Sequence, residues 1–305
     1  MLIGVIKSKK SMSTQHWRSV SPDTSSWQLG LGLESLLLQQ GKRGMEQVAA
    51  SLEPGYLARS LNHLVHAQGE VWLLSGFPVG DTFENDGPLG ALALARALQA
   101  AKRPCRLLCS RPLFAYMQEL LPCTEFPIMG REASQSLAMQ LLTTHSPALL
   151  LAIERVGMAA DGHYYSMRGQ CLSGRVAELD WLVREAECPV IAIGDGGNEI
   201  GMGKVNQALA SLPITPCVTG CTELIPATVS NWAGYVLAAW LMALQGRFLH
   251  EVFDLQHEAQ RMQQAGAVDG LTGQAELSED GFALQQGVAL VEQVEQLLGQ
   301  YYVLS

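Results

Sequence analysis

Short apolar runs that alternate with helix-patterned segments restrict the fold of this chain more than any other feature. Each run is bounded by turn residues and is too short for a typical helix, which favours buried strands. The runs lie at residues 70–77, 105–109, 124–129, 148–154 and 189–194. In the segments between these runs the apolar residues follow helical spacing. One such segment is Leu89–Ala101, which follows a proline suited to a first helical position. This order predicts an α/β fold with a mostly parallel sheet and helices on both faces, a Rossmann-like three-layer arrangement.

The two ends of the chain differ from this middle part. Beyond Pro226 the apolar spacing is mostly helical, so we expect a helical C-terminal region. Residues 1–30 are polar and rich in serine, which predicts a loose N-terminal arm. Residues 31–305 are within the size of one large α/β domain, and we expect a single domain there.

Composition narrows the class of partner. The net charge is −9 and the sequence holds no basic stripe, so nucleic acid is not expected. No segment reaches the roughly 18 apolar residues of a membrane helix. The seven cysteines form no CxxC pair, which fits a reducing compartment. We expect a soluble, cytoplasmic protein that acts on a small molecule; the apolar helix through Trp240 leaves a homo-oligomer open.

The segment IGDGGNEIGMG, residues 193–203, places five glycines and two acids directly after an apolar run. Glycines at such a turn can bring backbone amides, here those of Gly196 and Gly197, close to an anion. The spacing is neither a GxGxxG dinucleotide pattern nor a P-loop, so no nucleotide cofactor is expected. Two alternatives stay open: a phosphate- or nucleotide-handling enzyme with this loop as anion cradle, and a tight turn capped by Asp195 without a ligand.

Polar segments also follow two other predicted strands. Residues 75–88 carry Glu84 and Asp86 just before a helix, and a long loop after Glu154 carries Arg155 and Arg168. Ligands of open parallel sheets bind beyond the carboxyl ends of the strands, so all three segments are expected to face one crevice. Ordinary roles remain as alternatives, since an aspartate can cap a helix and a single arginine often forms a structural ion pair.

Taken in order, several blocks resemble a known family. They read GFP…ENDGPLGALALARAL, ER-G-A-DG-YYSMRG, IGDGGNEIGMG, SNWAGY and GAVDGLTG. This pattern, over about Gly41–Leu298, resembles the D-glutamate cyclase C-terminal-like family, whose larger members carry an additional N-terminal module. The family usually reads ETDGP where this chain has Asn85 between Glu84 and Asp86. The resemblance implies closure of D-glutamate to 5-oxo-D-proline with loss of water.

This reaction needs a base for the substrate amine and help for a carboxylate that must lose water. We expect Asp195, Glu199 and Asp86 to be catalytic. Mg²⁺ or Mn²⁺ would suit the second task, with Glu84, Asp86 and Asp195 as oxygen ligands. The expected residues for binding the amino-acid substrate are Gly196, Gly197, Asn198, Arg155, Arg168, Ser230 and Asn231. A non-catalytic amino-acid-binding protein is the remaining alternative.

Overall fold

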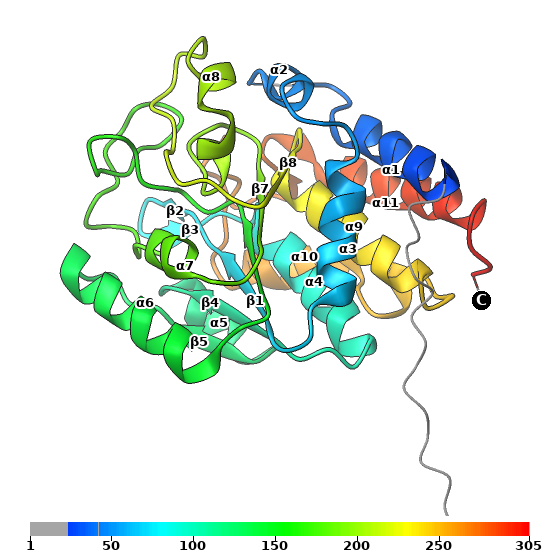
Figure 1. Ribbon diagram of the computed structural model, residues 1–305, viewed down its shortest axis with the longest axis horizontal. Helices are drawn as coiled ribbons and strands as arrows, with labels where there is room; N and C mark the ends of the chain where they lie inside the picture. The colour runs from blue at the N-terminus through cyan, green and yellow to red at the C-terminus, as the bar shows by residue number, and fades with distance from the viewer. Residues whose placement is uncertain (1–23, 42, 305) are drawn as a thin grey trace, which may run out of the picture.

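The computed structural model describes residues 24–41 and 43–304, and a parallel sheet of six strands forms its centre (Figure 1). The strand order is β5-β4-β1-β6-β7-β8, and every neighbouring pair is parallel. The strands are β1 (Val71–Ser75), β4 (Cys105–Cys109), β5 (Cys123–Glu125), β6 (Leu149–Ile153), β7 (Val190–Gly194) and β8 (Glu223–Pro226). The predicted mostly parallel sheet is therefore confirmed.

Helices cover both faces of the sheet and complete the predicted three layers (Figure 1). On one face α4 and α9 pack directly on the strands, with α1, α3, α10 and α11 around them. The other face is covered by α6 and α7, and near β7 and β8 by α2 and α8. The bounds are α1 Thr24–Leu37, α2 Met45–Ala50, α3 Tyr56–His66, α4 Pro88–Ala100, α5 Leu113–Met117, α6 Arg131–His145, α7 Asp180–Glu185, α8 Asn206–Leu209, α9 Ser230–Ala243, α10 Leu255–Gln264 and α11 Leu284–Gly299.

The chain reverses its direction across the sheet at β1. It runs outward from β1 through β4 to β5, then returns to β6 on the other side of β1. Loops that leave β1 and β6 therefore part in opposite directions and open a crevice at the carboxyl ends of these strands. In doubly wound folds this switch point is where ligands bind.

Two short hairpins bring further segments to the switch point. One hairpin joins β2 (Pro78–Val79) to β3 (Thr82–Phe83), and the other joins β9 (Ser278–Glu279) to β10 (Phe282–Ala283). Glu84, just after β3, forms an isolated bridge with Val268. The C-terminal part of the chain therefore reaches the same end of the sheet as the loop after β1.

Most of the secondary structure follows the sequence expectations. All five predicted runs contain strands, and the region beyond Pro226 is mostly helical. Strand β8 was not predicted, because its run is only four residues long and begins with the charged Glu223. None of the helices in the described ranges is long and apolar enough to cross a membrane.

The expected N-terminal arm needs a correction. Residues 24–30 belong to α1, because Leu29 and Leu33 on this helix are buried in the core. Residues 1–23, the rest of that expected arm, lie outside the described residues.

Candidate functional site

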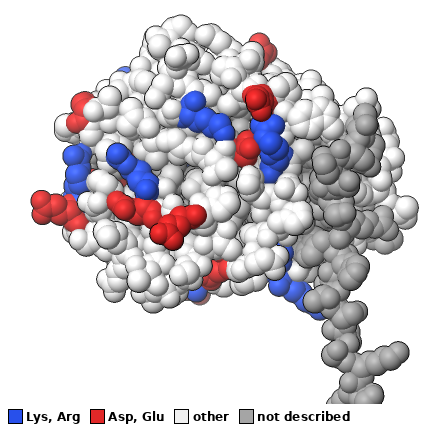
Figure 2. All heavy atoms as spheres, in the orientation of Figure 1, with Lys and Arg blue, Asp and Glu red and all other residues white. Residues whose placement is uncertain are grey.

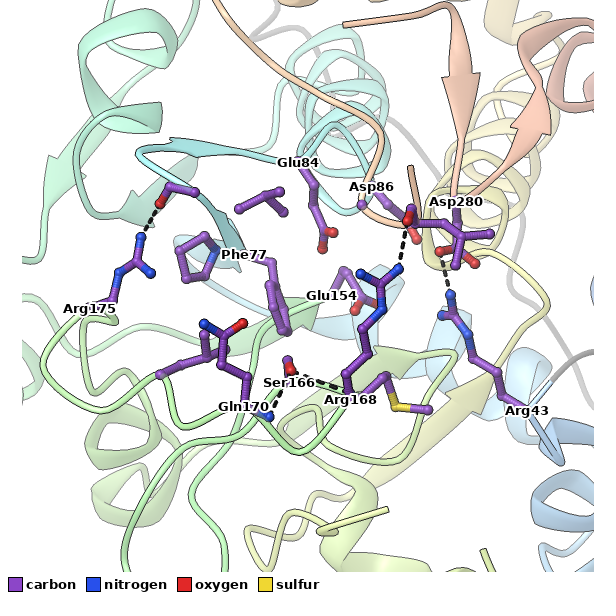
Figure 3. A pocket seen from close by; sticks show the side chains of 17 residues that line it. Arg43, Phe77, Glu84, Asp86, Glu154, Ser166, Arg168, Gln170, Arg175 and Asp280 are labelled. Atoms are coloured by element: carbon purple, nitrogen blue, oxygen red, sulfur yellow. Dashed lines mark hydrogen bonds and ion pairs between the residues drawn. The ribbon is translucent and has the colours of Figure 1, made fainter. Parts of the chain in front are cut away.

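A cavity of about 310 Å³ lies at the switch point between β1 and β6. Four acidic side chains line it together with three arginines (Figure 3). They are Glu84, Asp86, Glu154 and Asp280, and Arg43, Arg168 and Arg175. A cavity lined by so many buried carboxyl groups is costly to maintain, which favours a functional reason for their presence.

Asp86 is held by the start of a helix that is distant in sequence. One carboxylate oxygen accepts hydrogen bonds from the backbone amides of Gly87 (2.9 Å) and Asn231 (2.7 Å). The other accepts a bond from the amide of Ser230 at 3.2 Å. Asp86 therefore satisfies the free amides at the start of α9 instead of capping its own helix, α4.

Close packing makes this arrangement possible. Gly87 has a φ of +87°, and a Cβ there would lie 2.7 Å from the Cβ of Glu154 and 2.8 Å from the Ile153 carbonyl. A Cβ on Gly234 of α9 would lie 2.7 Å from the Cα of Gly90 of α4. These glycines let the loop after β3 lie against the end of β6, and α4 against α9.

Glu154 follows β6 in a strained backbone conformation. Its φ is +43°, a region that residues with a side chain rarely adopt. The Ser230 hydroxyl donates a 2.5 Å hydrogen bond to the carboxylate of Glu154, which lines the cavity beside Asp86. Backbone strain of this kind is concentrated at functional sites, so it supports a role for Glu154.

In the glycine-rich loop after β7, a backbone amide binds the carboxylate of a residue of the same loop. The amide of Gly197 donates a 2.7 Å hydrogen bond to the carboxylate of Glu199. Burial raises the pKa of Glu199, and the amides of Gly197 and Gly196 oppose this rise by stabilising the charge. The anion that these amides hold is thus the carboxylate of the loop itself, and Glu199, expected to be catalytic, is fully buried and does not line the cavity.

Arg43 links two acids from distant parts of the chain. Its guanidinium donates 2.5 Å hydrogen bonds to Asp195, just after β7, and to Asp280 in the β9–β10 turn. Interaction with Asp195 raises the pKa of Arg43 further, so this side chain is a fixed positive charge in the cluster. In Figure 3 Arg43 reaches the cavity from one side, while Asp280 lies directly above it.

Burial and mutual repulsion raise the pKa of these carboxyl groups. Burial raises the pKa of Asp86 to about 7, helped by the charge of Asp280. The pKa of Asp280 also rises to about 7, because of burial and of Asp195. Burial raises the pKa of Glu84 and of Glu154 well above the usual value. The charge of Asp86 adds to this rise at Glu84, and the charge of Asp195 adds to it at Glu154. Groups with a pKa near neutrality can both accept and donate a proton at physiological pH.

Three of the carboxyl groups are close enough to share one cation. Asp86, Glu154 and Asp195 each offer an oxygen, and these oxygens lie within 4.8 Å of one another. One oxygen of Asp195, Oδ2, is buried without a hydrogen-bond partner. Of the expected metal ligands, Asp86 and Asp195 belong to this triad. Glu84 lines the same cavity but is not part of it, and Glu154 completes the set.

The expected substrate-binding residues have several different environments. Arg168 lines the cavity, and its guanidinium points toward the acids while donating a 2.8 Å bond to the Leu271 carbonyl (Figure 3). The guanidinium of Arg155 is buried away from the cavity lining and donates to the carbonyls of Gly76 and Ala177. We therefore assign Arg155 to the support of the β1 loop and no longer to the substrate.

The remaining expected residues support the site from behind. Asn231 uses its side chain internally: its amide donates to Glu279, and its oxygen accepts from the amide of Gly90. Asn198 donates to the Tyr165 carbonyl, which fixes the loop after β6. The oxyanion role expected for Gly197 is corrected as well, because its amide donates to Glu199.

Sequence reasoning assigned no role to Glu154 and missed Arg43, Asp280 and Glu279. Glu279 is fully buried and accepts hydrogen bonds from Asn231 (2.8 Å) and from the Tyr235 hydroxyl (2.5 Å), so it underlies the start of α9. The available signal was the stretch SEDG at residues 278–281, where two consecutive acids precede a glycine and a helix. Nothing local in the sequence connects Arg43 to that stretch.

This chain is an α/β protein with an acidic cavity at the switch point of its doubly wound sheet, the place where such folds commonly bind small molecules. It belongs to the D-glutamate cyclase-like C-terminal family, which matches residues 33–295 and confirms the predicted family. Over 249 residues it is 31% identical to the human mitochondrial D-glutamate cyclase. This match covers 72% of the chain but only 40% of the human protein, so the chain corresponds to less than half of that relative.

Proposed function

We propose that this chain closes D-glutamate to 5-oxo-D-proline with loss of water, aided by a divalent cation. The observation that carries the proposal is the convergence of Asp86, Glu154 and Asp195, whose oxygens lie within 4.8 Å of one another at the switch point. The name of the human relative supports the same reaction.

The reaction is a redistribution of protons within one substrate. The α-ammonium nitrogen loses two protons and bonds to the γ-carbon, while one oxygen of the γ-carboxylate takes up both protons and leaves as water. Asp86 lines the cavity, and its carboxylate is suited to accept a proton from the nitrogen. Glu84 lines the same cavity, and its raised pKa keeps a proton available for the leaving oxygen.

Charge complementarity supports binding of an amino-acid substrate in the cavity. The ammonium group of an amino acid is attracted by the acids at the base of the cavity. Arg168 extends from the opposite loop and is suited to bind the α-carboxylate through charge-assisted hydrogen bonds (Figure 3). Both reacting groups belong to one molecule, so such positioning supplies much of the acceleration.

The carboxyl triad fits Mg²⁺ or Mn²⁺, because all its donors are oxygens and Oδ2 of Asp195 has no partner. Asp86, Glu154 and Asp195 would hold the cation. When bound, such a cation polarises the γ-carboxyl group and offsets the negative charge of the cluster.

The other two hypotheses from the sequence receive less support. A phosphate or nucleotide cradle needs free amides in the glycine-rich loop, and the Gly197 amide is bonded to Glu199. On the face drawn in Figure 2, basic side chains are scattered among acidic ones and form no continuous basic surface. A binding protein without activity would not explain why several acids with a raised pKa line the cavity.

The direct test is incubation of the purified chain with D-glutamate and with L-glutamate, with and without Mn²⁺, followed by chiral detection of 5-oxoproline. We expect 5-oxo-D-proline from D-glutamate. Thermal stabilisation by D-glutamate without any product would instead indicate a binding protein and would end the proposal.

A further inference from the structure

The cavity extends well beyond the acids that the proposed cyclisation uses. Figure 3 shows Glu84, Asp86, Glu154 and Asp280 in one half, with Phe77 near the middle. We call the other half, which holds Gln170 and Arg175 beyond Phe77, the distal half. The whole volume, about 310 Å³, reaches the range of pockets for drug-sized ligands, which begins at roughly 300 Å³. Free glutamate leaves the distal half unused.

The distal half combines apolar walls with one cation at its end. Phe77 and Leu172 are buried and contribute an apolar surface. The guanidinium of Arg175, at the far end, donates to the carbonyl of Gly80 and pairs with Asp81 at 3.7 Å. Asp81 is fully exposed, and such surface ion pairs contribute little, so Arg175 can exchange this partner for a ligand carboxylate. The distal half is therefore suited to a small group that ends in a carboxylate.

We propose that the site also cyclises γ-D-glutamyl amides of amino acids, with the released amino acid in the distal half and its carboxylate at Arg175. This inference rests on the proposed function, because the D-glutamyl part occupies the same acidic half. The γ-carbonyl then lies between the two halves, where Glu84 projects into the cavity (Figure 3).

The step balances without any co-reactant. The α-amino nitrogen bonds to the γ-carbonyl carbon, and the bond from that carbon to the amide nitrogen breaks. The α-ammonium group loses two protons, and the departing nitrogen gains two and leaves as the ammonium group of a free amino acid. The products are 5-oxo-D-proline and that amino acid. An amide carbonyl carries no negative charge, so the amine attacks it against less repulsion than it meets at a carboxylate.

The test uses the whole chain with γ-D-glutamylglycine, its glycinamide counterpart, D-glutamine and D-glutamate. We expect γ-D-glutamylglycine to yield 5-oxo-D-proline and glycine in equal amounts. Arg175→Ala should raise KM for γ-D-glutamylglycine by about tenfold and leave KM for the three other substrates unchanged, because only γ-D-glutamylglycine places a carboxylate at Arg175.

Gln170, which is exposed at the distal half, gives a second pair of variants. Gln170→Trp should block γ-D-glutamylglycine but not D-glutamate, and Gln170→Ala should affect neither. Turnover of D-glutamate without release of glycine would overturn this inference and leave the proposed function intact. Failure of all four substrates would overturn both. If Arg175→Ala does not change the release of glycine, Arg175 does not bind the carboxylate of the released amino acid.

Discussion

Arg43 Nη1 lies 2.5 Å from Oδ1 of Asp195, and this ion pair joins residues that are 152 positions apart. A second nitrogen of the same guanidinium lies 2.5 Å from Asp280, so one side chain connects the loop before α2, the end of β7 and the β9–β10 turn. Without the positive charge of Arg43, nothing from the N-terminal segment would offset the repulsion between the carboxylates of Asp195 and Asp280.

Replacing Arg43 should therefore destabilise the fold. We expect Arg43→Met to lower the free energy of unfolding by about 3 kcal/mol at pH 8, because it leaves buried carboxylates uncompensated. The loss should be smaller at pH 5, where the acids carry protons. Urea denaturation at both pH values measures this, with Arg43→Lys as the control that keeps the charge but not the bidentate geometry. Equal losses at pH 5 and pH 8 would show that packing, not charge, is responsible.

Stability should also depend on pH in the unmodified chain. Asp86, Glu279 and Asp280 have a pKa of about 7 in the folded state, above the value of about 4 in an unfolded chain. Between these values the folded state holds protons that the unfolded state has lost, so the free energy of unfolding falls as pH rises from about 4 to 7 and then levels off. Urea titrations across this interval test the direction.

A matched variant tests how much of this pH dependence of stability comes from Glu279. Glu279→Gln keeps hydrogen-bonding capacity toward Asn231 and Tyr235 but removes the titration. It should therefore make the decline in stability between about pH 4 and pH 7 less steep. A chain that becomes more stable from pH 5 to pH 8 would contradict the raised pKa values.

Asp86 is expected to be essential for turnover. Asp86→Asn removes the proton acceptor and should lower kcat for D-glutamate by about 100-fold or more, the usual range for general acid–base groups. Asp161→Asn, in the exposed part of the loop after β6, is the matched control and should retain full activity. If Asp86→Asn retains its turnover, the proton acceptor must be sought elsewhere, first at Glu154.

Substitutions of Arg168 and of Arg175 should differ in their effect on KM for D-glutamate. Arg168→Ala should raise KM for D-glutamate by about tenfold or more with a smaller effect on kcat, since it removes a charge-assisted contact to the α-carboxylate. Arg175 lines the same cavity from the far side, so Arg175→Ala should leave KM for D-glutamate unchanged. Steady-state kinetics on both variants would exclude this assignment if their KM values moved together.

Binding of a divalent cation can be measured apart from activity. Mn²⁺ should raise the melting temperature of chelator-treated protein, because a ligand that binds only the folded state stabilises it. Asp195→Asn should weaken this shift, whereas Glu258→Gln, an acid on α10 outside the triad, should not. An unchanged melting temperature at millimolar Mn²⁺, together with turnover that a chelator does not affect, would remove the cation from the mechanism.

Local sequence patterns were sufficient for the layers of the fold. Strands such as β4 (Cys105–Cys109) and helices such as α4 (Pro88–Ala100) show their apolar periodicity and start signals within a dozen residues. The polar segments after β1, β6 and β7 could also be assigned to one crevice, because the carboxyl ends of parallel strands lie at the same edge of a sheet. Asp86, Glu154 and Asp195 do meet there.

The partners of those polar groups could be known only from the tertiary structure. The sequence cannot show that Arg155 turns to the carbonyls of Gly76 and Ala177, or that the Gly197 amide is already bonded to Glu199. It also gives no sign that Arg43 reaches Asp280. Periodicity records which face of an element is buried, whereas hydrogen bonds and ion pairs between distant segments depend on how the packed layers bring those segments together.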